Sequence, residues 1–74
     1  MTIIHQESAL INIGERIRCL RKSAEMTQTE LAAALDMDQS EISRIERGER
    51  KLSVACLMQI ASVLSVPVQK LLEA

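Results

Sequence analysis

The chain has 74 residues and a formal net charge of −1, and 47% of its residues are hydrophobic although none is aromatic. This length predicts one domain, residues 1–74, with residues 1–10 as an N-terminal extension. The sequence contains no signal peptide and no apolar run near the ~18 residues of a spanning helix, which argues against a membrane role and leads us to expect a cytoplasmic protein.

Composition also limits the chemistry that we expect. Cys19 and Cys56 lack the partners of a metal site and fall in predicted helices, so free thiols are expected rather than a disulfide, with redox sensing as the alternative. His5, the only histidine, has no second ligand or nucleophile and is expected at the surface or in an interface. No nucleophile is paired with a base, so we expect no catalytic residue, metal, cofactor or small-molecule ligand.

The first predicted helix runs from about residue 10 or 12 to residue 24. Its apolar residues recur at three- and four-residue steps: Leu10, Ile13, Ile17, Leu20 and Ala24. Gly14 is expected to weaken the start of this helix only slightly. The same segment is basic, because residues 15–22 carry four basic side chains against one acidic side chain. Positive charge is therefore concentrated locally in a chain that is weakly acidic as a whole.

Two nearly identical phrases, MTQTEL and MDQSEI, follow each other eleven residues apart. In each phrase the side chain of Thr27 or Asp38 can accept a hydrogen bond from the backbone N–H of the residue three positions later. That later residue is a glutamate, whose side chain can accept the N–H of Thr27 or Asp38 in return, which makes a capping box. Two helix starts this close leave room for a short helix ending near Leu35 and a tight turn, which is helix-turn-helix geometry. Asp36 suits the turn, because aspartate tolerates a left-handed backbone.

The second half of the chain predicts three helix boundaries. Gly48 stands where a left-handed cap would end the third helix, and Ser53 opens a fourth. The apolar stripe of this fourth helix comprises Val54, Leu57, Ile60, Ala61 and Leu64. Pro67 disfavours a helical residue before it, so the fourth helix should break there, with Ser65 in its exit turn, and a short fifth helix is predicted over residues 68–72. The fold class is therefore all-α.

The third predicted helix separates an apolar face from a polar one. At ~100° per residue, Ile42 and Ile45 share one face, whereas the polar residues cluster nearly opposite: Ser40, Ser43, Arg44 and Arg47, with Gln39 at the leading end. A helix fits the major groove of B-DNA, where arginine can bond guanine, glutamine can bond adenine and serine can bond either base. This face suits base readout, and an ordinary solvated surface is the alternative.

From about Asn12 to Leu72 the sequence resembles the Cro/C1-type, or XRE, family of helix-turn-helix DNA-binding proteins. Four segments carry the resemblance: IGERIRCLR, TQTELAAAL, DQSEISRIERG and LMQIASVLSVPVQKLL. It implies a compact five-helix, lambda-repressor-like domain whose second and third helices form the helix-turn-helix. The residues that it implies in base reading are Gln39, Ser40, Ser43 and Arg44, and those in phosphate contact are Gln28, Arg47, Arg50 and Lys51.

The resemblance also implies a structural ion pair between Arg21 and Glu46. Leaving either charge alone in a low-dielectric site is costly, so losing one partner should cost more than the pair contributes net. Ala32 is given a structural role as well, because a small residue would let the third helix cross the second closely.

We expect from these features a transcriptional regulator, either a repressor or a controller protein, that binds a palindromic double-stranded DNA operator as a homodimer. One recognition helix reads only a few base pairs, and apolar residues are left over in the last two helices. They favour an interface that includes Val63, Val68 and Leu71, although scattered surface apolar residues are the alternative. The alternative function is a protein-binding module, such as an antitoxin or adaptor, with secondary DNA binding.

Overall fold

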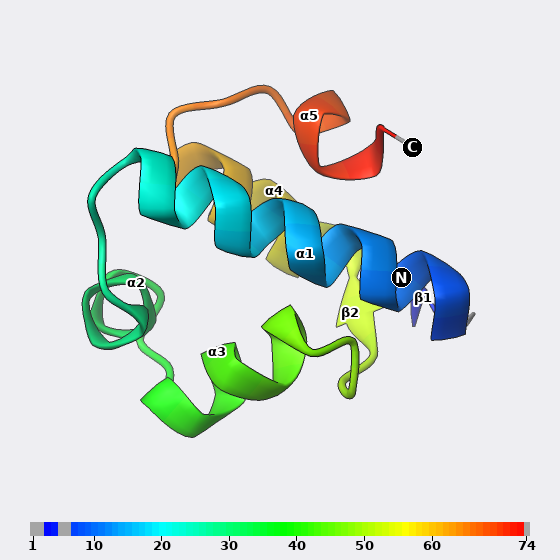
Figure 1. Cartoon of the computed structure of the whole chain (residues 1–74), viewed down its shortest axis with the longest axis horizontal. Coiled ribbons are helices and arrows are strands. Elements are labelled where there is room, and N and C mark those ends of the chain that lie inside the picture. Colours follow the sequence, from blue (N-terminus) through cyan, green and yellow to red (C-terminus); the bar gives the residue numbers. More distant parts are fainter. Residues whose placement is uncertain (1–2, 5–6, 74) are drawn as a thin grey trace.

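A computed structural model describes residues 3–4 and 7–73, and within them the chain forms five helices and one short two-stranded ribbon (Figure 1). The helices are α1 (Glu7–Ser23), α2 (Gln28–Ala34), α3 (Gln39–Glu46), α4 (Val54–Val63) and α5 (Gln69–Leu72), and the strands are β1 (Ile3–Ile4) and β2 (Leu52–Ser53). The predicted five-helix architecture is confirmed. His5 lies outside the described residues. No helix in the described part is long and apolar enough to cross a membrane.

Helix α1 buries Leu10, Ile13 and Ile17 as its stripe predicts, but the helix is shifted toward the N-terminus. It begins at Glu7 and ends at Ser23, so the prediction was wrong for Ala24, which is exposed and lies in the turn. The turn is completed by Glu25, whose φ of 58° is left-handed and incompatible with further helix.

Both predicted starts in the helix-turn-helix are present. At α2, the N–H of Glu30 donates to the Thr27 hydroxyl at 3.0 Å, and the N–H of Thr27 donates to Glu30 Oε1 at 2.9 Å. At α3, the N–H of Asp38 donates to Glu41 Oε1 at 3.3 Å. Asp36 has a φ of 56°, which confirms its place in the turn. The chain thus reverses between two helices in which a glutamate of the first turn accepts the N–H of the N-cap residue.

Two glycines shape the surroundings of α3. A Cβ at Gly14 would lie 2.5 Å from the carbonyl oxygen of Ile45, so α1 packs directly against the C-terminal end of α3, which sequence reasoning missed. Gly48 has a φ of 73°, and its N–H donates to Ile45 O at 3.0 Å while that of Glu49 donates to Arg44 O at 2.9 Å. These two bonds form a Schellman cap, as the glycine predicts.

The N-terminal extension is tied to the domain by backbone pairing. Strand β1 lies antiparallel to β2, with Ile3 opposite Ser53 and Ile4 opposite Leu52. Ser53 also caps α4, because its hydroxyl accepts the N–H of Cys56 at 3.1 Å. One short segment therefore both pairs with the N-terminus and starts the fourth helix.

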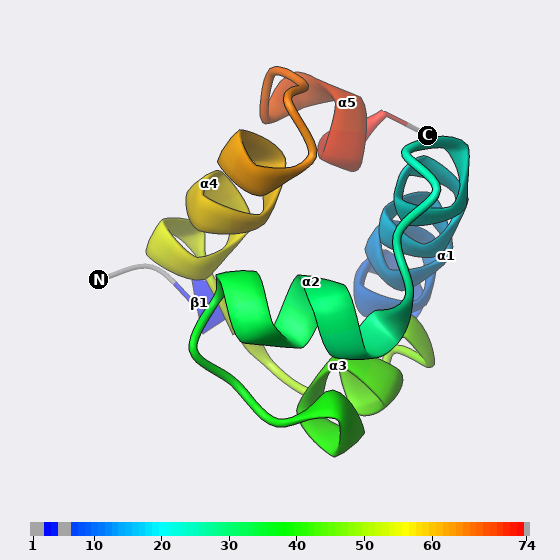
Figure 2. The same ribbon diagram turned by 90° about the vertical axis from the view of Figure 1, so that its left-hand side faces the viewer.

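Helix α4 buries Leu57, Ile60 and Ala61, but Val54 is 40% exposed, so the predicted stripe was wrong at its first position. Ser65, with a φ of 58°, takes the left-handed exit from the helix. The prediction of Leu71 as an interface residue was also wrong, because its side chain is only 1% exposed and packs within the core of its own chain. Helices α3 and α5 lie at opposite ends of the molecule (Figure 2).

Candidate nucleic-acid interface

The outward face of α3 is polar throughout. Ile42 and Ile45 are 0% and 1% exposed and fix one side of the helix in the core. The predicted base-reading residues lie on the other side: Gln39, Ser40 and Arg44 are exposed, and Ser43 is half-buried. The structure therefore brings all four onto one accessible surface. A helix presented in this way matches the width of the DNA major groove.

Beneath this face, Arg21 and Glu46 form a buried, bidentate ion pair. Arg21 Nε donates to Glu46 Oε2 at 2.7 Å and Nη2 donates to Oε1 at 3.1 Å, with the two side chains 8% and 3% exposed. Arg21 Nη1 also donates to the carbonyl oxygen of Met26 at 2.7 Å. The guanidinium thus joins α1 to α3 and to the residue before the Thr27 cap, with each charge compensated.

Two glutamines extend this ion pair to the surface. Gln28 Nε2 donates to Glu46 Oε1 at 3.0 Å, and Gln39 Nε2 donates to Gln28 Oε1 at 2.6 Å. Gln28 is the first residue of α2 and Gln39 the first of α3. The hydrogen-bonded series therefore runs from a buried charge pair to the exposed tip of α3, and it restricts the rotamer of Gln39.

The charged residues that are predicted to contact phosphate differ in whether they already form ion pairs within the protein. Arg47 donates to the Ser43 hydroxyl and, at 3.1 Å, to Glu49, in an ion pair whose side chains are more than half exposed. Arg50 is paired with Glu41. Lys51 is exposed, and among the described residues no carboxylate lies within ion-pair distance of it.

A polar hollow of about 350 Å³ lies between α1 and the helix-turn-helix. Its lining contains four basic side chains and one acidic side chain, a balance of +3: Arg18, Arg21, Lys22, Gln28, Ser43, Glu46 and Arg47. Sequence reasoning assigned no contact to Arg18 and Lys22, although their spacing on either side of Arg21 was a usable signal. The hollow adds positive potential beside Gln28 and Ser43.

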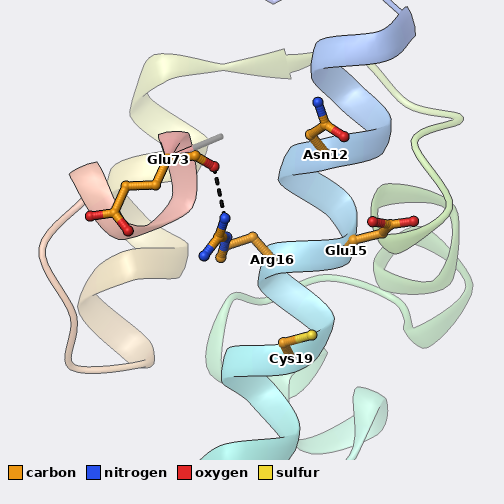
Figure 3. Close-up of a pocket in the computed structure, with 5 residues that line it drawn as sticks. All are labelled: Asn12, Glu15, Arg16, Cys19 and Glu73. Carbon is orange, nitrogen blue, oxygen red and sulfur yellow. Dashed lines mark hydrogen bonds between the residues drawn. The ribbon is translucent and has the colours of Figure 1, made fainter.

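A second hollow, of about 330 Å³, lies on another side of α1 and is lined by Asn12, Glu15, Arg16, Cys19 and Glu73 (Figure 3). Arg16 reaches across it, and Nη2 donates to the carbonyl oxygen of Glu73 at 2.9 Å. This bond ties α1 to the end of α5. With two carboxylates in its lining, the hollow is a poor site for DNA.

The two cysteines are both free and differ in accessibility. Cys19 is exposed, whereas Cys56 is half-buried at the start of α4. Burial raises the pKa of the Cys56 thiol, an effect opposed by nearby Arg50 and assisted by Glu41. Among the described residues, no group of His, Cys, Asp and Glu side chains could hold a metal ion.

Comparison with known proteins shows which family the chain resembles. A helix-turn-helix family model matches residues 17–71. The chain is 40% identical over 58 residues to the uncharacterized HTH-type transcriptional regulator YazB of Bacillus subtilis, covering 78% of this chain and 84% of that protein. It is 32% identical over 62 residues to control protein C.MunI of Mycoplasma sp, covering 82% and 84%.

The same architecture occurs in a solved structure. The restriction-modification controller protein C.AhdI from Aeromonas hydrophila superimposes with a TM-score of 0.81 and 30% sequence identity, covering 86% of this chain and 97% of that one. Other curated relatives are longer, and the chain spans only about two fifths of them, 42% of two regulators and 40% of a third.

Proposed function

We propose that this chain, which belongs to the Cro/C1-type (XRE) family of helix-turn-helix proteins, is a transcriptional regulator of the controller or repressor type. It is proposed to bind a palindromic DNA operator as a homodimer. The observation that carries this proposal is the outward face of α3, which is polar and accessible while Ile42 and Ile45 anchor the opposite face.

Gln39 is the proposed reader of adenine. Bidentate recognition of adenine requires one acceptor for N6 and one donor for N7. Gln39 Nε2 carries two hydrogens and gives one to Gln28, which leaves the second hydrogen and the carbonyl oxygen for the base. Because Gln28 holds the amide in place, less side-chain entropy is lost when Gln39 meets the base.

Arg44 is the proposed reader of guanine, since its fork of donors fits O6 and N7 together. It is exposed and lies one turn beyond Ser40 on the same face. Ser40 and Ser43 can contact either base, although the Ser43 hydroxyl already accepts a hydrogen bond from Arg47. Specificity is thus assigned chiefly to Gln39 and Arg44.

Phosphate contacts are proposed for Gln28, Arg47 and Lys51, and the +3 hollow adds Arg18 and Lys22 to this set. The second N–H of the Gln28 amide remains available for a phosphate oxygen once the first is given to Glu46. Lysine and arginine neutralise phosphate charge and release counterions, so binding should weaken as salt rises. Arg50, predicted with this group, has its guanidinium engaged by Glu41.

A homodimer is proposed because one copy is too small to read two half-sites. The longest dimension of the molecule is 27 Å, whereas two successive major-groove faces are about 34–36 Å apart. The proposed contact surface is formed by α4 and α5, which expose Met58 (57%) and Leu72 (53%). Helix α5 lies at the end of the molecule away from α3 (Figure 2). Val63 and Val68 are half-buried beside the contact surface.

The proposal is tested by selecting bound sequences from random DNA, footprinting the best site and measuring the mass of the protein by sedimentation. We expect a dimer at micromolar concentration and an imperfect palindrome with half-site centres roughly 10 base pairs apart. A monomer that protects one non-palindromic half-site would overturn the dimeric operator. The absence of any selected sequence would overturn the function itself, and a stable complex with a second protein would favour the antitoxin or adaptor class.

A further inference from the structure

The ion pair between Arg50 and Glu41 links the two ends of α3. Arg50 Nη1 donates to Glu41 Oε2, and the two side chains are 38% and 28% exposed. The other oxygen of the same carboxylate, Oε1, accepts the N–H of Asp38, the residue that caps α3. Glu41 therefore connects the entry of the helix to the segment that follows it.

The backbone around Arg50 is fixed on both sides. The Schellman cap at Gly48 reverses the chain after α3, and Leu52, which is 1% exposed, holds the next segment in the core. Residue 50 is thereby brought back toward a carboxylate nine positions earlier. An eight-residue helix is about 12 Å long, so this contact depends on the reversal of the chain.

We propose that Arg50 is a positioning residue, which neutralises Glu41 and holds the first turn of α3 in place, and that it is not a contact to a DNA phosphate. The inference rests on the proposed function, because it concerns how α3 is presented to DNA. An uncompensated carboxylate next to Ser40 would repel the phosphates that flank the groove. The ion pair removes this repulsion and orients the turn that carries Gln39 and Ser40.

The surroundings of the pair support this assignment. Arg50 and Glu41 both act electrostatically on the Cys56 thiol, so the pair lies near enough to the first turn of α4 to affect its charge. Its neighbour Lys51 is exposed and has no described carboxylate within ion-pair distance. Two adjacent positive charges thus have different environments, and Lys51→Ala is a matched control for Arg50→Ala.

The test compares binding of both variants to the selected operator and to random DNA across a salt series, at a temperature where all proteins are folded. Arg50→Ala should lower operator affinity roughly tenfold and random-DNA affinity by a smaller factor, with the salt slope nearly constant. The released carboxylate repels the phosphates of either DNA, whereas the loss of a fixed first turn of α3 affects only base reading. Lys51→Ala should weaken both DNAs similarly and reduce the salt slope by about one. Arg50→Ala behaving like Lys51→Ala, or like the unmodified protein, would overturn the proposal.

A double-variant cycle with Glu41→Gln separates the two roles further. Glutamine retains an acceptor for the Asp38 N–H but carries no charge, so Glu41→Gln/Arg50→Ala should bind the operator more tightly than Arg50→Ala alone. Under a phosphate role, Glu41→Gln would instead raise the affinity of both backgrounds equally. The same cycle in thermal unfolding without DNA should also be non-additive, and additivity there would overturn the ion pair. If no protein in the series selects DNA, the proposed function fails while the unfolding cycle still decides the role of Arg50.

Discussion

Helices α3 and α4 are built alike and face solvent differently. Each is entered from an extended N-cap residue, Asp38 or Ser53, and each buries three residues. In α3 the buried set includes the charged Glu46, and the outer face carries Gln39 and Arg44; in α4 the buried set is wholly apolar, and the outer face carries Val54 and Met58. The difference supports the proposal that α3 recognises DNA and that α4 contributes to self-association.

The buried residues of α3 and α4 also differ in the kind of interaction that holds them. The core of α4 is held by the hydrophobic effect, which needs no fixed direction between groups. The end of α3 is held by directional bonds from Glu46 to Arg21 and Gln28, which fix the orientation of the helix as well as its depth. A helix that reads DNA, as proposed for α3, must meet base edges at defined positions, so directional anchoring suits the proposed role.

The largest expected effect comes from breaking the anchor of α3. Glu46→Ala should lower the free energy of unfolding by about 3–5 kcal/mol, because Arg21 would remain as an uncompensated buried charge. Urea unfolding measures the loss. The double variant Arg21→Leu/Glu46→Leu should regain much of that stability, and a double variant as unstable as the single one would contradict the charge argument.

The second prediction concerns how closely α1 supports α3. Gly14→Ala should destabilise the protein by about 1–3 kcal/mol, because the new Cβ would meet backbone carbonyl oxygens at the end of α3. Asn12→Ala is the matched control on the exposed side of α1 and should change stability by no more than about 0.5 kcal/mol. A stabilised Gly14→Ala protein would show that the two helices separate without cost.

On the outer face of α3, Arg44→Ala should reduce operator binding by about 1–3 kcal/mol and relax preference at one base position. The mass of the protein should not change, because the proposed contact surface is formed by α4 and α5 and not by α3. Gel-shift titration of operator variants and sedimentation give the two readouts. An equal loss on operator and random DNA would make Arg44 a phosphate contact.

On the outer face of α4, Met58→Glu should weaken self-association, and DNA binding should weaken with it. It places a charge in the proposed contact surface, so sedimentation should detect a shift toward monomer and operator affinity should fall at least about tenfold. Ser8→Glu, which adds the same charge at an exposed position of α1, should leave the mass unchanged. Weaker DNA binding by a protein that stays dimeric would remove Met58 from the interface.

Sequence chemistry located the helix starts and turns because these depend on neighbouring residues. Thr27 with Glu30, Asp36 and Gly48 each adopt the expected local conformation. The errors occur where distant segments decide. Periodicity shows which side of a helix is apolar but not where the core ends, so Val54 was placed inside and Leu71 outside.

The candidate site shows the same division. The polar face of α3 follows from its helical period, whereas the link from Gln28 to Gln39 depends on how α2 and α3 cross. The pairing of Arg50 with Glu41 likewise depends on the chain reversal after α3, and the family resemblance instead suggested phosphate contact for Arg50. Residue type predicted which side chains carry chemistry, and tertiary packing determined the partners that restrain them.

The smallest expected effect distinguishes the cap of α2, in the helix-turn-helix, from the cap of α4 by its dependence on pH. Hydrogen bonding to the backbone of Thr27, and then to its side chain, lowers the pKa of Glu30 below 4.5. A lowered pKa means that the carboxylate stabilises α2 above about pH 4.5, and that this contribution is lost as the pH falls through the folded-state value. The cap of α4 is the neutral Ser53 hydroxyl, which has no such dependence.

Glu30→Gln should therefore lower the thermal midpoint slightly at about pH 7 and leave it nearly unchanged at about pH 2, where the native glutamate is protonated as well. Ser53→Ala should lower the midpoint similarly at both pH values, because the bond that it removes carries no titrating group. The amide resonance of Thr27 in the unmodified protein should titrate with a midpoint below 4.5. If Glu30→Gln lowers the midpoint equally at both pH values, the charge of Glu30 contributes nothing to the start of α2.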